Sequence, residues 1–229
     1  MIIRLQFMSV TALQLVIFDF DGTLADTCRV IVNTLQETMR QMRLPVKDEA
    51  ECTSVIGLTL EDAFRALFPE GDEGLAEECA ATYRRIFEVN RKKLTPSWFP
   101  HVRETLSWLR EQGCDVAVAT SRSSRSLHIL LAEMAETVPF SQIVGSEDVV
   151  NHKPDAEPVM RILSATGVEA ENALVVGDMP VDILMGRNAG THTCGVNFGN
   201  SSREQLLEAG ADYVIDDMSE LRDVVTSIG

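Results

Sequence analysis

The sequence predicts an α/β fold, a parallel sheet with helices on both faces and a small all-helical insertion after the first strand. Residues 15–18 are four consecutive apolar residues, the pattern of a strand buried on both faces of a parallel sheet. Residues 28–95 show only helical spacing of apolar residues, whereas short apolar strands alternate with helices from residue 102 onward. Such alternation is typical of a parallel sheet that is covered by its crossover helices.

The insertion begins directly after the first strand and its loop. Apolar or weakly polar residues recur at helical spacing over residues 28–42, and Pro45 ends this helix. Further helices are expected over residues 48–56, 59–67 and 75–93, separated by Gly57 and by a Pro-Glu-Gly turn at 69–71. The break at residues 94–97 returns the chain to the alternating pattern.

The remainder of the chain repeats a strand and a helix several times. Strands are expected over residues 115–119, 142–145, 173–176, 193–196 and 213–215, and helices over 102–112, 124–136, 156–166, 181–189, 202–209 and 219–226. Gly113, Gly167 and Gly190 stand where three of these helices end, as C-terminal glycines commonly do. We therefore assign residues 14–27 and 96–229 to a Rossmann-like core, 28–95 to a helical domain, and 1–13 to an N-terminal extension.

Composition narrows the classes of function. The net charge of −15 argues against a general nucleic-acid binder and against binding to an anionic membrane surface, because both need a basic face. The five cysteines are an odd number without a C-x-x-C pair, which indicates reduced thiols and predicts a cytoplasmic protein. No apolar stretch is long enough to span a bilayer.

Two carboxylates, Asp19 and Asp21, follow the first strand. Residues two apart on an extended chain point the same way, so both are expected to face one pocket at the carboxyl edge of the sheet. Gly22 permits a sharp turn after them. Carboxylates this close repel one another unless a cation or a shared proton compensates. The alternative is a polar strand end, with Asp21-Gly22 as a turn and Thr23 or Asp26 as a helix cap.

Polar residues also follow two later strands or precede a helix. Thr120 and Ser121 end the strand over 115–119, where a hydroxyl and free amides suit a phosphate oxygen, although a serine here is also a common helix cap. Lys153 stands just before a helix, a place that the helix dipole makes mildly unfavourable for a cation. Asp178 ends the apolar strand over 173–176, and Asp182 lies in the first turn of the next helix, where the dipole alone favours an acidic residue.

The string from Asp19 to Thr27 resembles the first motif of the haloacid dehalogenase superfamily, Asp-x-Asp-Gly-Thr-Leu-x-Asp-[Ser/Thr], without a departure. The other three motifs have counterparts in the same order: Thr120, Lys153, and Gly177-Asp178 with Asp182. The resemblance covers nearly the whole chain from residue 15 onward. The helical domain over 28–95 is similar to the small helical cap that this superfamily carries between its first two motifs.

The resemblance implies a Mg²⁺-dependent phosphatase that hydrolyses a small-molecule phosphate monoester through an aspartyl-phosphate. Asp19 would be the nucleophile, and Asp21 the general acid and base. Mg²⁺ would be held by Asp19, by the backbone carbonyl of Asp21 and by Asp178.

The other motif residues receive supporting roles from the same resemblance. Lys153 and the hydroxyl of Thr120, together with Ser121, would bind the phosphate oxygens. Asp182 would orient Lys153 or the waters of the metal.

Within the superfamily the chain is most similar to the phosphoglycolate phosphatase group, although His101 stands where that group usually has glycine. A β-phosphoglucomutase-like enzyme would carry histidine near position 31 and a basic residue near 60, where this chain has Ile31 and Leu60. A phosphonoacetaldehyde hydrolase would need a lysine in the cap, and none lies between Lys47 and Lys92. Phosphoryl transfer and inorganic pyrophosphate hydrolysis remain alternatives, as do a monomer and a homodimer.

An alternative of a different class is a non-catalytic regulatory or binding protein on the same fold. The presence of every motif carboxylate, with Thr120 and Lys153, argues against it.

Overall fold

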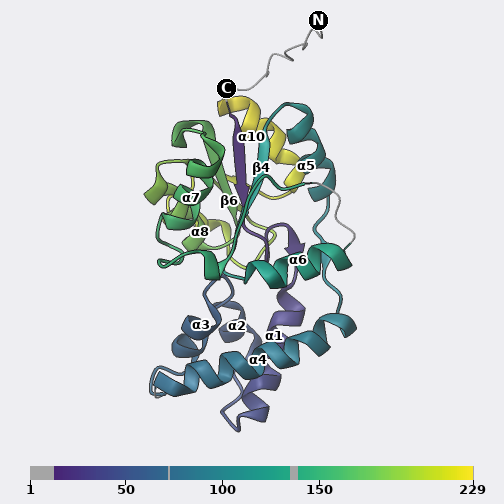
Figure 1. The fold of residues 1–229 in the computed structure, drawn as a ribbon, viewed down its shortest axis with the longest axis vertical. Coiled ribbons are helices and arrows are strands. Elements are labelled where there is room, and N and C mark those ends of the chain that lie inside the picture. Colours follow the sequence, from purple (N-terminus) through teal and green to yellow (C-terminus); the bar gives the residue numbers. More distant parts are fainter. Residues whose placement is uncertain (1–12, 72, 135–138, 229) are drawn as a thin grey trace, which may run out of the picture.

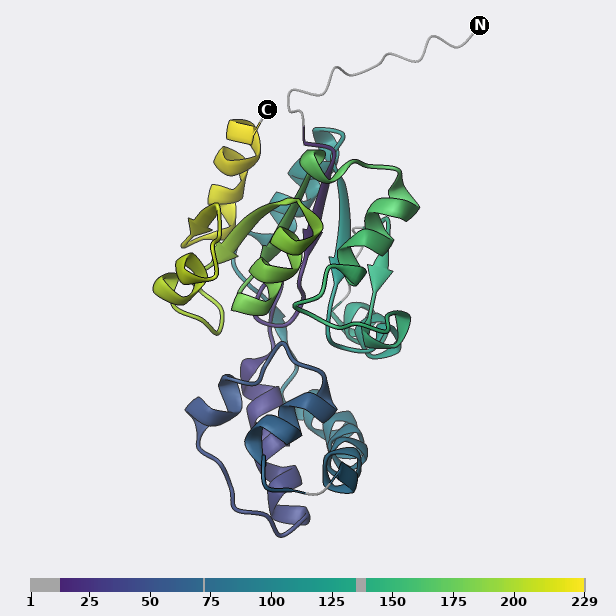
Figure 2. The same cartoon turned by 90° about the vertical axis from the view of Figure 1, so that its left-hand side faces the viewer.

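The chain forms a sheet unit and a helical unit, which lie end to end (Figure 1). The computed structural model describes residues 13–71, 73–134 and 139–228. The helical unit lies beyond the edge at which the central strands end, as the second view also shows (Figure 2). The loops that follow the strands therefore face the helices.

Six parallel strands form the sheet in the order β5-β4-β1-β6-β7-β8. They are β1 (Leu15–Phe18), β4 (Asp115–Ala119), β5 (Ile143–Val144), β6 (Ala173–Gly177), β7 (His192–Val196) and β8 (Tyr213–Ile215). Leu15 of the central β1 is paired with Asp115 of β4 on one side and with Ala173 of β6 on the other. The strand order reverses beside β1, and open α/β sheets bind their ligands at such a switch point.

Helices cover both faces of the sheet. The elements are α5 (Val102–Glu111), α6 (Ser124–Glu133), α7 (Glu157–Thr166), α8 (Pro180–Ala189), α9 (Arg203–Glu208) and α10 (Leu221–Ile228). Leu15 and Ile17 pack with residues of α7 and α8, whereas Val16 and Phe18 belong to the cluster that includes α5, α6 and α10. The alternation of side chains along β1 thus divides the core into two layers.

The helical unit consists of α1 (Cys28–Gln41), α2 (Glu49–Thr53), α3 (Leu60–Leu67) and α4 (Glu73–Lys93). The long α4 packs against α1 and α3. Asp48 caps α2 by accepting a hydrogen bond from the amide of Glu51, and Thr59 caps α3 by accepting one from Asp62. These caps explain why two short helices begin where they do.

Two strands of two residues each join the units. β2 (Ala25–Asp26) pairs with β3 (Ser97–Trp98) in antiparallel fashion. The sequence predicts neither strand, because a strand of two residues has no periodicity to detect. The ring of Trp98 meets Phe20 edge to face, with 6.1 Å between centroids.

The predicted α/β fold is confirmed, with differences at element boundaries. Leu13 was assigned to the N-terminal extension but is 1% exposed and belongs to the core cluster. The helix expected over 48–56 is shorter, because α2 ends at Thr53. The predicted end of the helix over 124–136 lies outside the described residues, as do residues 1–12. Within the described ranges no helix combines the length and apolar character needed to cross a membrane.

Candidate active site

Asp19 and Asp21 lie at the carboxyl end of β1, as predicted. The amide of Asp19 still donates to the carbonyl of Val176, at 2.9 Å, so Asp19 extends the ladder between β1 and β6. Its side chain is buried, whereas that of Asp21 is half-buried. Gly22 then turns the chain with a φ of +87°, and a Cβ there would lie 2.2 Å from Oδ2 of Asp178. Only glycine fits both the conformation and the close approach.

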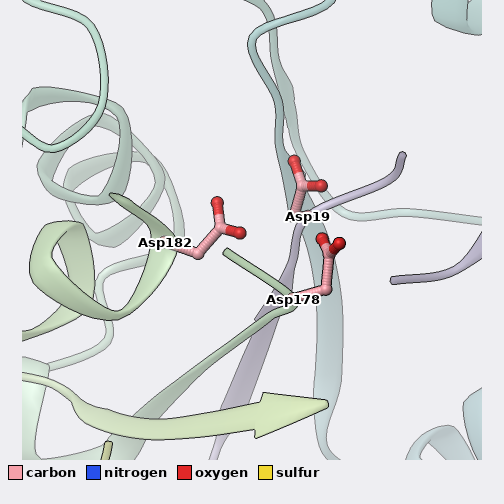
Figure 3. A group of neighbouring side chains, drawn as sticks. All are labelled: Asp19, Asp178 and Asp182. Carbon is pink, nitrogen blue, oxygen red and sulfur yellow. The ribbon is translucent and has the colours of Figure 1, made fainter. Parts of the chain in front are cut away.

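Three carboxylates from three elements gather at this edge of the sheet. Figure 3 shows Asp19 after β1, Asp178 after β6 and Asp182 in the first turn of α8. One oxygen of each lies within 4.8 Å of the others, and all three residues are buried. The sheet brings Asp19 and Asp178 together because β1 and β6 are neighbours in the same register.

Lys153 lies within this group of carboxylates. Its Nζ donates to Oδ1 of Asp19 at 2.5 Å and to Oδ1 of Asp182 at 2.7 Å. Asp182 also accepts from the amide of Met179 at 3.0 Å, so its two oxygens hold Lys153 and the start of α8. Burial lowers the pKa of Lys153, but Asp182 and Asp19 outweigh this effect and raise its pKa above the usual range. Lys153 is therefore a fixed positive charge.

Asp178 is held by neighbours that donate hydrogen bonds. Asn200 donates to Oδ2 from its backbone amide at 2.8 Å and from Nδ2 at 2.7 Å. Thr23 donates from Oγ1 to Oδ1 at 3.1 Å. Thr23 is therefore no helix cap, and α1 begins after Thr27 without a side-chain cap. These bonds fix the orientation of a carboxylate at the end of β6.

The site carries more negative than positive charge. It holds four carboxylates and two cationic groups: Asp19, Asp21, Asp178 and Asp182, with Lys153 and Arg122. Burial raises the pKa of Asp19, against the effect of Lys153. Burial, with the neighbouring Asp182, raises the pKa of Asp178 to about 7. Ionisation of all four carboxylates leaves an excess of two negative charges, which a divalent cation bound to oxygen ligands would balance.

Thr120 and Ser121 follow β4 as predicted, but their hydroxyls have partners within the chain. Oγ1 of Thr120, which is buried, accepts from the amide of Arg122 at 3.1 Å. Oγ of Ser121 donates to the carbonyl of Gly57 at 2.6 Å, across to the helical unit. The serine that caps the next helix is Ser123, whose Oγ accepts a hydrogen bond from the amide of Ser126 at 3.3 Å.

A cavity of about 420 Å³ lies between the helical unit and this edge of the sheet. Asp21 and Arg122 line it from the sheet unit, and α1, α3 and α4 supply much of the opposite wall. Its volume is typical of a small-molecule site. The carboxylates, Lys153 and the cavity together form a candidate active site.

Comparison with known proteins identifies the family. A family model described as haloacid dehalogenase-like hydrolase matches residues 16–196, which is most of the chain. The chain belongs to the haloacid dehalogenase-like hydrolases. The resemblance that the four motifs indicate is thereby confirmed, and the protein is an enzyme of the hydrolase class.

One curated relative agrees with this assignment, and solved structures share the fold. The chain is 34% identical to the pyrophosphatase PpaX of Halalkalibacterium halodurans over 213 residues, covering 92% of this chain and 95% of the relative. Its fold matches the crystal structure of a hydrolase from Pseudomonas syringae with a TM-score of 0.84, at 24% identity over 94% and 99% of the two chains. A predicted phosphoglycolate phosphatase from Haemophilus somnus matches with a TM-score of 0.82, at 22% identity over 93% and 98%.

The sequence analysis missed three residues that this hydrolase places at the site. Arg122 binds the carboxylate of Asp21, while Thr23 and Asn200 bind Asp178. Arg122 had a detectable signal, because a cationic residue directly follows the Thr-Ser pair at the end of β4. Asn200 had no such signal in the sequence, since it lies in a loop after β7 among other polar residues.

Proposed function

We propose that this hydrolase is a Mg²⁺-dependent phosphatase that acts on a small-molecule phosphate monoester through an aspartyl-phosphate. One observation carries the proposal. The buried carboxylate of Asp19 lies against Lys153 and Asp178, while Asp21, two residues further on, faces the cavity. A nucleophile beside groups that neutralise phosphate oxygens, with a second carboxylate on the side of the leaving group, suits phosphoryl transfer to Asp19.

In the first step an oxygen of Asp19 attacks phosphorus and the bond from phosphorus to the ester oxygen breaks. The electron pair of that bond goes to the leaving oxygen, which takes a proton from Asp21. The products are the free alcohol and an aspartyl-phosphate on Asp19.

In the second step Asp21 removes a proton from water, which attacks the phosphorus of the aspartyl-phosphate. The bond between phosphorus and Asp19 breaks, its electron pair returns to the carboxylate, and inorganic phosphate leaves. Asp21 ends this step protonated, as it was before the first one.

Lys153 and the hydroxyl of Thr120 would neutralise and bind the phosphate oxygens. Ser121 would join them by exchanging its hydrogen bond to Gly57 for one to phosphate. Asp182 keeps Lys153 in place through the bond at 2.7 Å.

The residues present fit Mg²⁺, because buried carboxylates in negative excess are the oxygen ligands that this ion prefers. Asp19, Asp178 and the backbone carbonyl of Asp21 would hold it. When bound, the ion would offset the charge of the phosphate oxygens that otherwise repel an anionic nucleophile.

We infer that the helical unit acts as the cap domain, spanning residues 28–95 between core segments 14–27 and 96–229. The cavity between the two units supports this role, since residues of both line it. We also infer a cytoplasmic location, consistent with five free cysteines, of which four are buried.

Hydrolysis of inorganic pyrophosphate is a second candidate function. It is favoured by the name of the PpaX relative, which is 34% identical to this chain.

The test is phosphate release, with and without Mg²⁺, from phosphoglycolate, sugar phosphates, nucleotides, pyrophosphate and acetyl phosphate. We expect metal-dependent release by the wild type and a loss of at least about a thousandfold in kcat for Asp19→Asn, because the amide cannot act as the nucleophile. If the folded wild type released no phosphate from any compound of the panel, the phosphatase function would be rejected and a binding role favoured.

A further inference from the structure

The cavity lies on the leaving-group side of the proposed reaction. Asp21, the proposed acid for the leaving oxygen, lines it, whereas Asp19, Lys153 and Asp178 do not. On the basis of the proposed phosphatase function, we infer that the leaving group is an uncharged and largely apolar alcohol of several carbon atoms. Orthophosphate and glycolate, the leaving groups of pyrophosphate and phosphoglycolate, do not fit the chemistry of this cavity.

Much of the cavity wall that the helical unit supplies is apolar, although Thr59, Glu61, Arg84 and Glu88 also line it. Its apolar part is formed by residues of α1 and α4, by the segment around α3 and by the loop before it: Ile31, Leu35, Val55, Ile56, Leu60 and Phe87. Ile31, Val55, Ile56 and Phe87 are each at most 8% exposed and belong to the core cluster. Burial of alkyl groups against such side chains is favourable, at about 25 cal/mol for each Å² removed from water.

Most of the charged residues that line the cavity are paired with an opposite charge. They are three acidic and three basic residues: Asp21, Glu61, Glu88, Arg84, Arg122 and Arg125. Arg84 is paired with Glu61 at 2.8 Å, Arg122 with Asp21 at 2.6 Å, and Glu88 with Arg91, which lies outside the lining, at 2.5 Å. Among the described residues of the lining, the one cationic group left for an anionic leaving group is that of Arg125, which is exposed to water.

The apolar residues and this pairing together decide between the candidate leaving groups. Transfer of an orthophosphate or a carboxylate from water to an apolar wall is costly unless the charge is paired there. An alkyl or aryl alcohol carries no such cost, and a site of about 420 Å³ has room for one of several carbons.

The test uses a series of n-alkyl phosphates, ethyl, butyl and hexyl, whose leaving oxygens have similar basicity. Phosphate release by the full chain with Mg²⁺ gives kcat/KM for each, alongside phosphoglycolate, pyrophosphate and acetyl phosphate. We expect kcat/KM to rise about fourfold for each added methylene from ethyl to butyl, which corresponds to roughly 0.8 kcal/mol for a buried CH₂. Hexyl phosphate is expected to exceed both phosphoglycolate and pyrophosphate.

A variant pair locates the effect in the cavity. Leu60→Lys places a cation on the apolar wall and should lower the hexyl-to-ethyl ratio by about tenfold while it improves pyrophosphate hydrolysis. Leu207→Lys, on the exposed face of α9 and 52% exposed before substitution, is the matched control and should keep the wild-type ratio. Circular dichroism checks that both variants fold.

The outcomes separate the inference from the proposed function. A flat or falling alkyl series, or pyrophosphate or phosphoglycolate as the best substrate, would overturn the apolar leaving group while the phosphatase stands. Hydrolysis of acetyl phosphate and of no other compound would also overturn the apolar leaving group. If the wild type released no phosphate from any compound, the phosphatase function would be rejected, together with the inference that rests on it.

Discussion

The guanidinium of Arg122 donates two hydrogen bonds to the carboxylate of Asp21, from Nη2 to Oδ1 at 2.6 Å and from Nε to Oδ2 at 3.0 Å. Its third nitrogen, Nη1, donates to Oγ of Ser126 at 3.0 Å, and its carbon centre lies 4.8 Å from the ring centroid of Phe87. The half-buried side chain of Arg122 therefore joins the proposed acid to α6 and to helix α4 of the helical unit.

Arg122→Lys should lower kcat by roughly 10–100-fold with little change in KM. Lysine keeps the charge but cannot make two parallel bonds to one carboxylate, so Asp21 loses its fixed orientation. Steady-state kinetics on the best substrate of the panel measure kcat and KM separately. Arg161→Lys, on the exposed face of α7, is the control and should match the wild type. An unchanged kcat in Arg122→Lys would show that the pairing does not position Asp21.

Mg²⁺ should raise the thermal stability of the protein through Asp178. At a concentration of a hundred times its dissociation constant, a ligand of the folded state adds about 2.7 kcal/mol, or roughly 5–10 °C in Tm for a chain of this size. Differential scanning calorimetry with added Mg²⁺ or EDTA measures the shift. Asp178→Asn should abolish it, whereas Asp223→Asn, an exposed residue of α10, should retain it. An equal shift in Asp178→Asn would place the ion elsewhere.

The metal-free protein should lose stability as pH rises from about 5 to 7. The pKa of Asp178 is raised to about 7 when folded, above the roughly 3.9 of an unfolded Asp, so the folded chain binds more protons in this interval. The free energy of unfolding therefore falls with rising pH, by up to about 3 kcal/mol. Urea unfolding in EDTA at several pH values measures the slope, and Asp178→Asn should reduce it. Rising stability over this interval would contradict the prediction.

His101 should be a site of local backbone strain. It precedes α5 with a φ of +61°, the left-handed region that favours glycine, at the position where the resemblance to the phosphoglycolate phosphatase group predicts glycine. Since both substitutions remove the hydrogen bond to Asp217, His101→Gly should be more stable than His101→Ala by about 1 kcal/mol. At Arg161, inside α7, the Ala variant should instead be more stable than the Gly variant by about 1 kcal/mol, because glycine is unfavourable within a helix. Urea unfolding of the four variants measures these differences in stability. A His101→Ala variant more stable than His101→Gly would refute the backbone strain.

Much of the fold could be read from local patterns. Apolar runs predict β1, β4 and β6, because strands buried on both faces need continuous apolar sequence. Gly167 and Gly190 have positive φ at the ends of α7 and α8, as the sequence analysis expects. The strands β2 and β3 are not predicted from the sequence, because each is a strand only through its hydrogen bonds to the other.

The amino-acid sequence was sufficient to establish the α/β class, the helical segment between the first two main strands, and the family that the motifs resemble. The class and the helical segment follow from periodicity, which is a local property of the chain, and the family follows from the resemblance of its motifs. The folded structure was needed to show that Arg122 holds Asp21, that Asn200 and Thr23 hold Asp178, and that apolar residues of the helical unit line the cavity. Such contacts join residues far apart in sequence, and they depend on strand order and on how the helical unit packs over the sheet, which no local pattern encodes.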